Sequence, residues 1–152
     1  ADPAPRVWAA LELADMVKLS ADEFAFLVAS AGGEKAMFER LWPGSTRLVI
    51  VTDGSAPIRW FTRDVSGSMP AYRVHAVDST GAGDAFVGGV LHGLIKSAVN
   101  PGTLDALWSD AMRRDTLLRF AAACGALAVL RAGSFAAMPE RSAVVSFLEK
   151  YR

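Results

Sequence analysis

Three features of this 152-residue sequence predict an α/β fold. Short apolar runs alternate with segments that have the apolar spacing of helices, which is typical of α/β proteins. The run Arg47-Leu-Val-Ile-Val-Thr52 is rich in β-branched residues and apolar on both faces, as strands of parallel sheets are. Because 52% of the residues are apolar, the chain has enough apolar surface for one compact domain with its own core.

In the first half of the chain, turn residues separate the expected strands from the expected helices. Ser20-Ala-Asp-Glu23 follows an apolar run and has the pattern of a capping box, which begins a helix. Gly32-Gly33 and Pro43-Gly44 end two successive helices. The expected order is strand 15–19, helix 21–30, helix 34–42, strand 47–52, and two edge strands at 57–63 and 71–77 that form a hairpin or meander.

The second half of the chain is expected to be helical. Asn100-Pro101-Gly102 breaks the helical pattern, and small residues at 120–126 allow a helix to pack closely on its neighbours. Pro139 occupies a favourable first-turn position. We expect helices over 84–96, over 103–131 with or without an interruption, and over 139–150.

Composition and charge exclude several classes of partner. The 16 basic and 16 acidic residues give a formal charge of zero, so there is no basic field for nucleic acid or an acidic membrane. No apolar run approaches the ~20 residues of a membrane span, and residues 1–5 lack the pattern of a signal peptide. The single Cys124 is expected to be a buried thiol, and it leaves no disulfide within the chain. We therefore expect a cytoplasmic protein without nucleic-acid or membrane partners.

The turn at residues 81–84 is the most informative segment. Gly81-Ala82-Gly83 runs directly into a helix, whose first N–H groups point outward and whose dipole favours negative charge. Glycine also lets a phosphate approach the backbone closely. Asp84 lies beside these N–H groups. It is either a carboxylate that serves an anion site or a side chain that only stabilises the helix N-terminus, and the turn by itself leaves both interpretations open.

The segment Asp78-Ser-Thr-Gly-Ala-Gly-Asp-Ala-Phe86 resembles the second signature of the PfkB family of carbohydrate kinases, usually Asp-Thr-x-Gly-Ala-Gly-Asp-x-Phe. Other segments resemble the family in the expected order: Lys18–Glu23, Val51–Gly54, Ala126–Gly133 and Met138-Pro139. The resemblance implies a ribokinase-like fold, which is a three-layer α/β/α arrangement with a mainly parallel central sheet. It also implies ATP-dependent phosphorylation of a sugar hydroxyl.

The resemblance assigns roles to individual residues. Asp84 matches the general base that accepts the proton of the sugar hydroxyl, and Gly81, Ala82 and Gly83 match the anion hole for the transferring phosphate. The positions that match nucleotide-binding ones are Lys18, Ser20, Glu23, Thr52, Gly54, Ala122 and Gly125. The family motif has asparagine where this chain has Ser20, and often where it has Ala122. Ser20 is therefore interpreted mainly as a helix cap, and base contacts near Ala122 as apolar or backbone contacts.

The cofactors that the resemblance implies are ATP and Mg²⁺, with K⁺ as an additional cation in some family members. Glu23 matches the glutamate that acts on Mg²⁺ through water. The carbonyl groups that would bind K⁺ belong to Asp78, Thr80, Ala128, Arg131 and Gly133. Ala137 cannot supply the side-chain oxygen that some relatives add.

PfkB kinases are considerably longer than this chain. We therefore expect residues 1–152 to be the C-terminal nucleotide-binding portion of a kinase domain, without the N-terminal half that binds the sugar and forms the lid. The full-length protein is expected to bind a sugar and ATP and to form a homodimer. Residues Asp2–Trp8 resemble an altered form of the family's Asp-x-Asn-x-Arg segment.

Several functional alternatives stay open at this point. The small residues around 124–129 most resemble fructokinases, so fructose is the expected sugar. The alternatives are kinases of the same fold that act on adenosine, ketodeoxygluconate or tagatose phosphate, and a non-catalytic kinase-like binding module. A Rossmann dehydrogenase is excluded because Phe86 stands where that motif requires a third glycine. His75 and His92 have no further ligands at metal-binding spacing.

Overall fold

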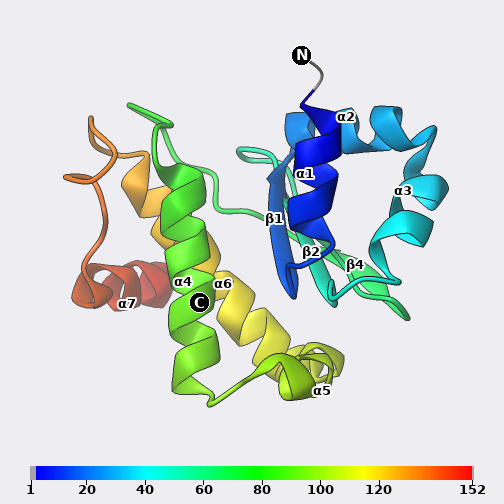
Figure 1. Cartoon of the computed structure of the whole chain (residues 1–152). Helices are drawn as coiled ribbons and strands as arrows, with labels where there is room; N and C mark the ends of the chain where they lie inside the picture. The colour runs from blue at the N-terminus through cyan, green and yellow to red at the C-terminus, as the bar shows by residue number, and fades with distance from the viewer. Residues whose placement is uncertain (1–2, 152) are drawn as a thin grey trace. The chain divides into compact units, whose positions relative to one another are not determined.

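The computed structural model describes residues 3–151 and contains two compact units, one up to Ser68 and the other from Met69 onward (Figure 1). The first unit combines a β-sheet with helices, and the second unit is helical. The predicted α/β class is therefore confirmed, with the strands concentrated in the first half of the chain.

In the first unit, three helices contribute to a core with a mixed sheet of strand order β1-β2-β3-β4. β1 and β2 are parallel, whereas β2 and β3 are antiparallel. The elements are α1 (Ala4–Leu11), β1 (Met16–Ser20), α2 (Ala21–Ala31), α3 (Glu34–Leu41), β2 (Leu48–Thr52), β3 (Ile58–Phe61) and β4 (Ser66–Met69).

β2 is the most deeply buried strand of this sheet. Leu48, Val49 and Ile50 are each 0% exposed, as expected for an apolar strand with a hydrogen-bonded neighbour on either side. Val49 shares a core cluster with Trp8 of α1 and Leu27 of α2. This packing holds β1 and β2 side by side. The carboxyl ends of both strands therefore lie together on one side of the sheet.

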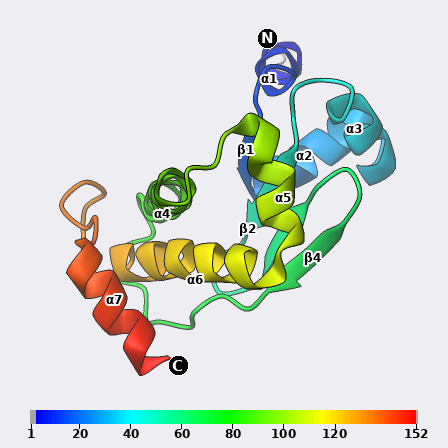
Figure 2. The same ribbon diagram turned by 90° about the horizontal axis from the view of Figure 1, so that it is seen from below.

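In the second unit, α4 and α6 pack against each other and cross at an angle (Figures 1 and 2). Two glycines of α4 allow the close approach: a Cβ on Gly89 would lie 2.6 Å from the Cα of Ala121, and one on Gly93 would lie 2.9 Å from the Cγ of Leu117. The elements are α4 (Ala82–Lys96), the 3-10 helix η1 (Pro101–Thr103), α5 (Leu104–Ser109), α6 (Ala111–Ala128) and α7 (Arg141–Lys150).

Most of the predicted elements are confirmed, with different ends. α4 begins at Ala82, two residues before the predicted start. The predicted long helical stretch is divided at Asp110, whose side chain accepts a hydrogen bond from the N–H of Arg113 and so begins α6. The last helix begins at Arg141, so Pro139 precedes it rather than occupying its first turn.

One prediction about local structure is wrong. Residues 71–77 form no strand, because the neighbour of β3 is β4, and the N–H of Val77 donates instead to the carbonyl of Val129 at 2.7 Å. The segment compared above with the family's Asp-x-Asn-x-Arg motif is largely helical, since α1 begins at Ala4; Asp2 lies outside the described residues. Within residues 3–151, no helix combines the length and the apolar character that a bilayer crossing requires.

Candidate active site

The carboxyl ends of β1 and β2 hold the first group of predicted nucleotide-binding residues. Ser20 at the end of β1 is paired with Thr52 at the end of β2, and Lys18 lies two residues earlier on β1. Glu23 follows in the first turn of α2, and Gly54 lies just after β2. Because the two strands are parallel, the structure brings these five residues to one edge of the sheet, where α/β proteins commonly bind ligands.

Ser20 and Glu23 form the predicted capping box. The N–H of Ser20 donates to Glu23 Oε2 at 2.6 Å, and the N–H of Glu23 donates to Ser20 Oγ at 3.2 Å. The bond from the backbone of Ser20 holds the pKa of Glu23 below its ordinary value of 4.5. Glu23 is exposed, and its Oε1 atom forms no hydrogen bond with residues 3–151, so this second oxygen is available to a ligand or to water.

The turn after β2 depends on Gly54. Its φ of +50° lies in the left-handed region, which favours glycine, and the N–H of Ala56 closes the turn on the carbonyl of Asp53 at 2.8 Å. A Cβ added to Gly54 would meet nothing within 4 Å. The backbone of this turn is therefore exposed and accessible to a ligand at the same sheet edge.

The second group of predicted residues lies at the N-terminus of α4. Gly81 is the N-cap, with a left-handed φ of +81°, and a Cβ at this position would lie 3.0 Å from the Cβ of Ser134. A residue other than glycine would therefore meet both backbone strain and a steric contact. Glycine at position 81 is what lets the chain turn sharply into the helix.

The N–H groups of this first turn differ in their hydrogen bonding. That of Ala82 donates to the carbonyl of Ser79 at 3.2 Å. Those of Gly83 and Asp84 donate to no group within residues 3–151, as expected for the first turn of a helix. The predicted anion hole thus has free donors at Gly83 and Asp84, whereas the N–H of Ala82 is already engaged.

Asp84 lies in the first turn of α4 with an exposed side chain. Gly81, as the N-cap, provides no side-chain cap, and the Asp84 carboxylate forms neither a hydrogen bond nor an ion pair with residues 3–151. The interpretation of Asp84 as a residue that caps the helix by a hydrogen bond therefore has no support in the geometry. Its carboxylate remains accessible beside the free N–H groups.

Asp78 connects the signature turn to a distant loop. Its Oδ1 accepts the N–H of Thr80 at 2.9 Å, and its Oδ2 accepts the N–H of Gly133 at 2.9 Å. These bonds, that from Gly133 first, lower the pKa of Asp78 to about 2. The structure thereby brings together three of the five residues predicted to bind K⁺ through their carbonyls. The other two, Ala128 and Arg131, lie at the end of α6 and in the loop that follows it.

The two predicted positions on α6 differ in their surroundings. Ala122 is buried, with 6% exposure. Gly125 lies under the first turn of α4, because a Cβ at this position would be 3.2 Å from the carbonyl oxygen of Ala82. Gly125 therefore allows α6 to approach the N-terminus of α4.

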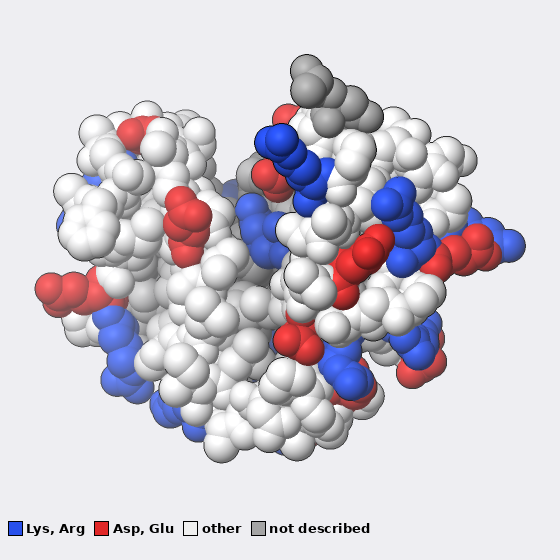
Figure 3. Space-filling view, viewed as in Figure 1, with Lys and Arg blue, Asp and Glu red and all other residues white. Residues whose placement is uncertain are grey.

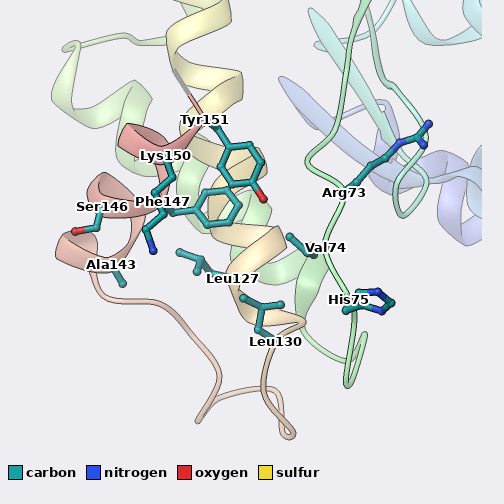
Figure 4. A pocket seen from close by; sticks show the side chains of 10 residues that line it. All are labelled: Arg73, Val74, His75, Leu127, Leu130, Ala143, Ser146, Phe147, Lys150 and Tyr151. Atoms are coloured by element: carbon teal, nitrogen blue, oxygen red, sulfur yellow. The ribbon is translucent and has the colours of Figure 1, made fainter.

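A pocket of about 630 Å³ in the second unit lies apart from these residues. Val74, Leu127 and Phe147 line its apolar part, whereas the side chains of Arg73 and His75 point away from α7 (Figure 4). None of the residues predicted for the site lines this pocket. The complete lining is Arg73, Val74, His75, Leu127, Leu130, Ala143, Ser146, Phe147, Lys150 and Tyr151.

The charged side chains on the visible face are concentrated over the first unit, and the surface around α4 is mostly uncharged (Figure 3). Residues 3–151 contain no group of three or more His, Cys, Asp or Glu side chains that could hold a metal ion. Cys124 is buried, as predicted, and burial raises the pKa of its thiol to about 11.

Sequence reasoning missed the loop that supports the signature turn. Val129 accepts hydrogen bonds from the N–H groups of Val77 and Asp78 through its backbone carbonyl, and Ser134 contacts the Gly81 turn. A backbone carbonyl leaves no signal in the sequence. The Asx turn at Asp78 could have been found, because aspartate two residues before a free N–H is a common turn former.

Comparisons with known proteins show what the whole chain is similar to. The family "pfkB family carbohydrate kinase" matches residues 2–141. Fructokinase-2 of Oryza sativa subsp. japonica is 36% identical over 137 residues, which are 90% of this chain and 39% of that protein. The chain thus spans about two fifths of the length of this curated relative.

Solved structures resemble the whole chain. The crystal structure of fructokinase with bound ATP from Xylella fastidiosa has a TM-score of 0.94 and 41% identity, and the match covers 99% of this chain and 47% of that one. Fructokinase double-mutant from Vibrio cholerae O395, in a form with bound fructose, ADP and potassium ion, has a TM-score of 0.79 and 30% identity, covering 97% and 46%. Ribokinase from Thermotoga maritima has a TM-score of 0.73 and 26% identity, covering 97% and 48%.

The fold is therefore part of a ribokinase-like domain, and the chain belongs to the pfkB family of carbohydrate kinases.

Proposed function

We propose that the chain is the nucleotide-binding portion of a longer ATP-dependent kinase, which transfers the γ-phosphoryl group of ATP to a hydroxyl of fructose. The observation that carries this proposal is the N-terminus of α4 in a chain of this family. There, free N–H groups at Gly83 and Asp84 lie in the same turn as an unpaired, exposed carboxylate.

The two features of this turn suit the two needs of phosphoryl transfer. As the hydroxyl oxygen attacks the γ-phosphorus and the bond to the β–γ bridging oxygen breaks, negative charge spreads over the transferring group. The N–H groups of Gly83 and Asp84, with the helix dipole, would stabilise that charge. The Asp84 carboxylate would accept the hydroxyl proton, so ADP and the sugar phosphate are the products.

The edge formed by β1 and β2 would bind the nucleotide. Lys18 supplies a positive charge, and Ser20, Thr52 and the open Gly54 turn supply hydroxyl and backbone groups at the same edge. Considered by itself, α6 has Gly125, which leaves room for the first turn of α4, and Ala122, which at 6% exposure could make only an apolar contact.

The residues present fit a magnesium ion that is held through water. Glu23 uses Oε2 in its capping bond, and its Oε1 remains available to accept a hydrogen bond from a metal-bound water. When bound, Mg²⁺ would neutralise charge on the phosphates of ATP. K⁺ is proposed as a further cation near Asp78, Thr80, Ala128, Arg131 and Gly133, with support from the potassium ion in the fructokinase of Vibrio cholerae O395.

A non-catalytic binding module is the second candidate function. It is favoured by the use of Glu23 in a cap and by alanine at position 122. Such a module would bind Mg-ATP without consuming it, so calorimetry with and without Mg²⁺ together with ADP release separates the two candidates. Kinases for adenosine, ketodeoxygluconate or tagatose phosphate would differ from a fructokinase only in the acceptor.

The experiment that tests the proposal uses the full-length protein that contains this chain. The protein is incubated with Mg-ATP and, in separate reactions, with fructose, adenosine, ketodeoxygluconate and tagatose phosphate. We expect fructose to give a phosphorylated product and ADP in equal amounts, as measured by mass spectrometry and a coupled ADP assay. Phosphorylation of another acceptor instead of fructose would correct the substrate, and nucleotide binding without any product would reject the kinase.

A further inference from the structure

Asp78 is the one acidic side chain of the signature turn that the reaction proposed above does not use. It lies three residues before the N-cap Gly81, and its carboxylate accepts hydrogen bonds from two backbone N–H groups. Oδ1 accepts from Thr80 within the turn, and Oδ2 accepts from Gly133, 55 residues further along the chain. A carboxylate that accepts a backbone N–H with each oxygen restrains both segments, because such charge-assisted bonds are stronger than neutral ones.

The loop after α6 contacts the signature segment at three places. At its start, the carbonyl of Val129 accepts the N–H groups of Val77 at 2.7 Å and Asp78 at 3.2 Å. In its middle, Gly133 donates to Asp78 with a left-handed φ of +92°, a conformation in which glycine is favoured. At its end, Ser134 lies against Gly81.

These contacts make the direction of the first turn of α4 depend on the loop. Among these contacts between the loop and the signature segment, only the bond from Gly133 involves a side chain of that segment, namely Asp78. A substitution at Asp78 can therefore remove this bond without changing the backbone.

We propose that Asp78 is a positioning residue, whose carboxylate holds the 129–134 loop against the signature turn and so sets the orientation of the free N–H groups at Gly83 and Asp84. This inference rests on the proposed function, since it assigns those N–H groups to the transferring phosphate. Asp78 touches no reacting atom in this account and acts through the backbone.

Two substitutions of Asp78 test the inference, and one substitution elsewhere is the control. Asp78→Asn keeps a single carbonyl oxygen, so its NH₂ group faces one of the two amide donors. Asp78→Ser can bond to Thr80 but is too short for Gly133. Asp110→Asn is the matched control, because Asp110 also accepts a backbone N–H, that of Arg113, at an exposed helix start of the same unit.

The first measurement is amide hydrogen exchange in the full-length protein, which does not depend on activity. Asp78→Ser, which loses the bond to Gly133, should speed exchange at Gly133 by about tenfold or more, and Asp110→Asn should not. Asp78→Asn should speed exchange at Gly133 or at Thr80, whichever N–H its NH₂ group faces. The second measurement is steady-state kinetics with Mg-ATP and fructose. A misdirected anion hole should lower kcat by about 10- to 100-fold and leave the KM for Mg-ATP within about threefold of wild type.

The outcomes separate this inference from the proposed function. Faster exchange at Gly133 with a selective loss of kcat supports the positioning role. If the wild-type protein is a kinase and the Asp78 variants have the same kcat as Asp110→Asn, the inference is overturned and the proposed function stands. A loss of kcat that merely follows the unfolded fraction, measured by thermal denaturation of the same samples, also overturns it. If the wild-type protein transfers no phosphoryl group, the proposed function itself fails.

Discussion

The two carboxylate oxygens of Glu23 are assigned different partners. Oε2 accepts the capping bond at the start of α2, and Oε1 is proposed to accept a hydrogen bond from metal-bound water. The capping bond from Ser20 lowers the pKa of Glu23 below 4.5. A depressed pKa stabilises the folded state above the unfolded pKa, and that contribution is lost as the pH falls through the folded pKa. The cap is therefore strongest at neutral pH.

Substitution of Glu23 should reveal this pH dependence. Glu23→Ala is expected to lower the free energy of unfolding by about 0.5–1 kcal/mol at pH 7, because a capping bond is lost. The difference from wild type should shrink as the pH is lowered below 4.5. Denaturant titrations at several pH values measure it. Glu34→Ala is the control, since Glu34 lies in the first turn of α3, whose N-cap makes no side-chain bond. A pH-independent loss in Glu23→Ala equal to that of the control would contradict the assigned cap.

Gly88 and Gly89, two neighbouring glycines of α4, differ in the space around them. A Cβ at Gly88 would meet nothing within 4 Å, whereas a Cβ at Gly89 would lie 2.6 Å from the Cα of Ala121 on α6. Both glycines have ordinary helical backbone. Substitution by alanine at Gly88 therefore changes only the conformational entropy of the chain, whereas at Gly89 it also causes a steric clash with α6.

We therefore expect opposite effects from one pair of substitutions. Gly88→Ala should raise the free energy of unfolding by about 0.5–1 kcal/mol, because alanine is the better helix former and space is available. Gly89→Ala should lower it by about 1–3 kcal/mol, because α4 and α6 must move apart. Thermal denaturation of the two variants side by side measures the difference. Equal melting temperatures would mean that α4 and α6 do not pack through Gly89.

The helices and strands that could be predicted are those marked by a pattern within their own residues, such as a capping box or an apolar run. The capping box at Ser20 and the two-sided apolar run of β2 sufficed to place the two strands and the helix start, whereas the nucleotide-site candidates among these residues came from the resemblance to the PfkB family. β4 could not be predicted, because its segment is polar, and Gly67 in that strand leaves room for the ring of Trp60, with a Cβ at 2.5 Å from Cζ2. Residues 71–77 have β-branched residues but no strand partner in the described chain, so propensity alone misled.

The site could be predicted only in part, for the same reason. Gly81 and Asp84 carry a motif, so their place at a helix start was expected and is confirmed. The bond between Asp78 and Gly133 joins residues 55 positions apart, and no local pattern encodes it. The engagement of the Ala82 N–H by Ser79 also follows only from the shape of the turn, and it moves the free donors toward Gly83 and Asp84.

The exposed apolar surface of α4 has consequences at the scale of the whole molecule. Leu91 is 46% exposed and Ile95 is 77% exposed, and the two lie one turn apart on α4. β1 also lies at an edge of the described sheet, with β2 as its hydrogen-bonded neighbour. Exposed apolar patches and open strand edges both favour association.

We expect residues 1–152, expressed alone, to self-associate and to lack turnover with fructose. Replacing Leu91 and Ile95 by glutamine should reduce association, as measured by light scattering over a range of concentrations. Met112→Gln is the control, because Met112 is 80% exposed but lies on α6. A monomeric wild-type chain, or rapid phosphorylation of fructose by it, would contradict this expectation.

The central claim is that Asp84 acts as the base beside a phosphate-binding helix start, and one measurement on Asp84→Asn in the full-length protein tests it most directly. Asparagine keeps the size and polarity of the side chain, so stability should change by no more than about 1 kcal/mol. It cannot accept the hydroxyl proton, so kcat for fructose-dependent ADP release should fall by about 10²–10⁴-fold, with Mg-ATP affinity within a few-fold of wild type. Asp105→Asn, in the first turn of α5, should keep normal turnover. Near-normal kcat in a folded Asp84→Asn protein would contradict the claim.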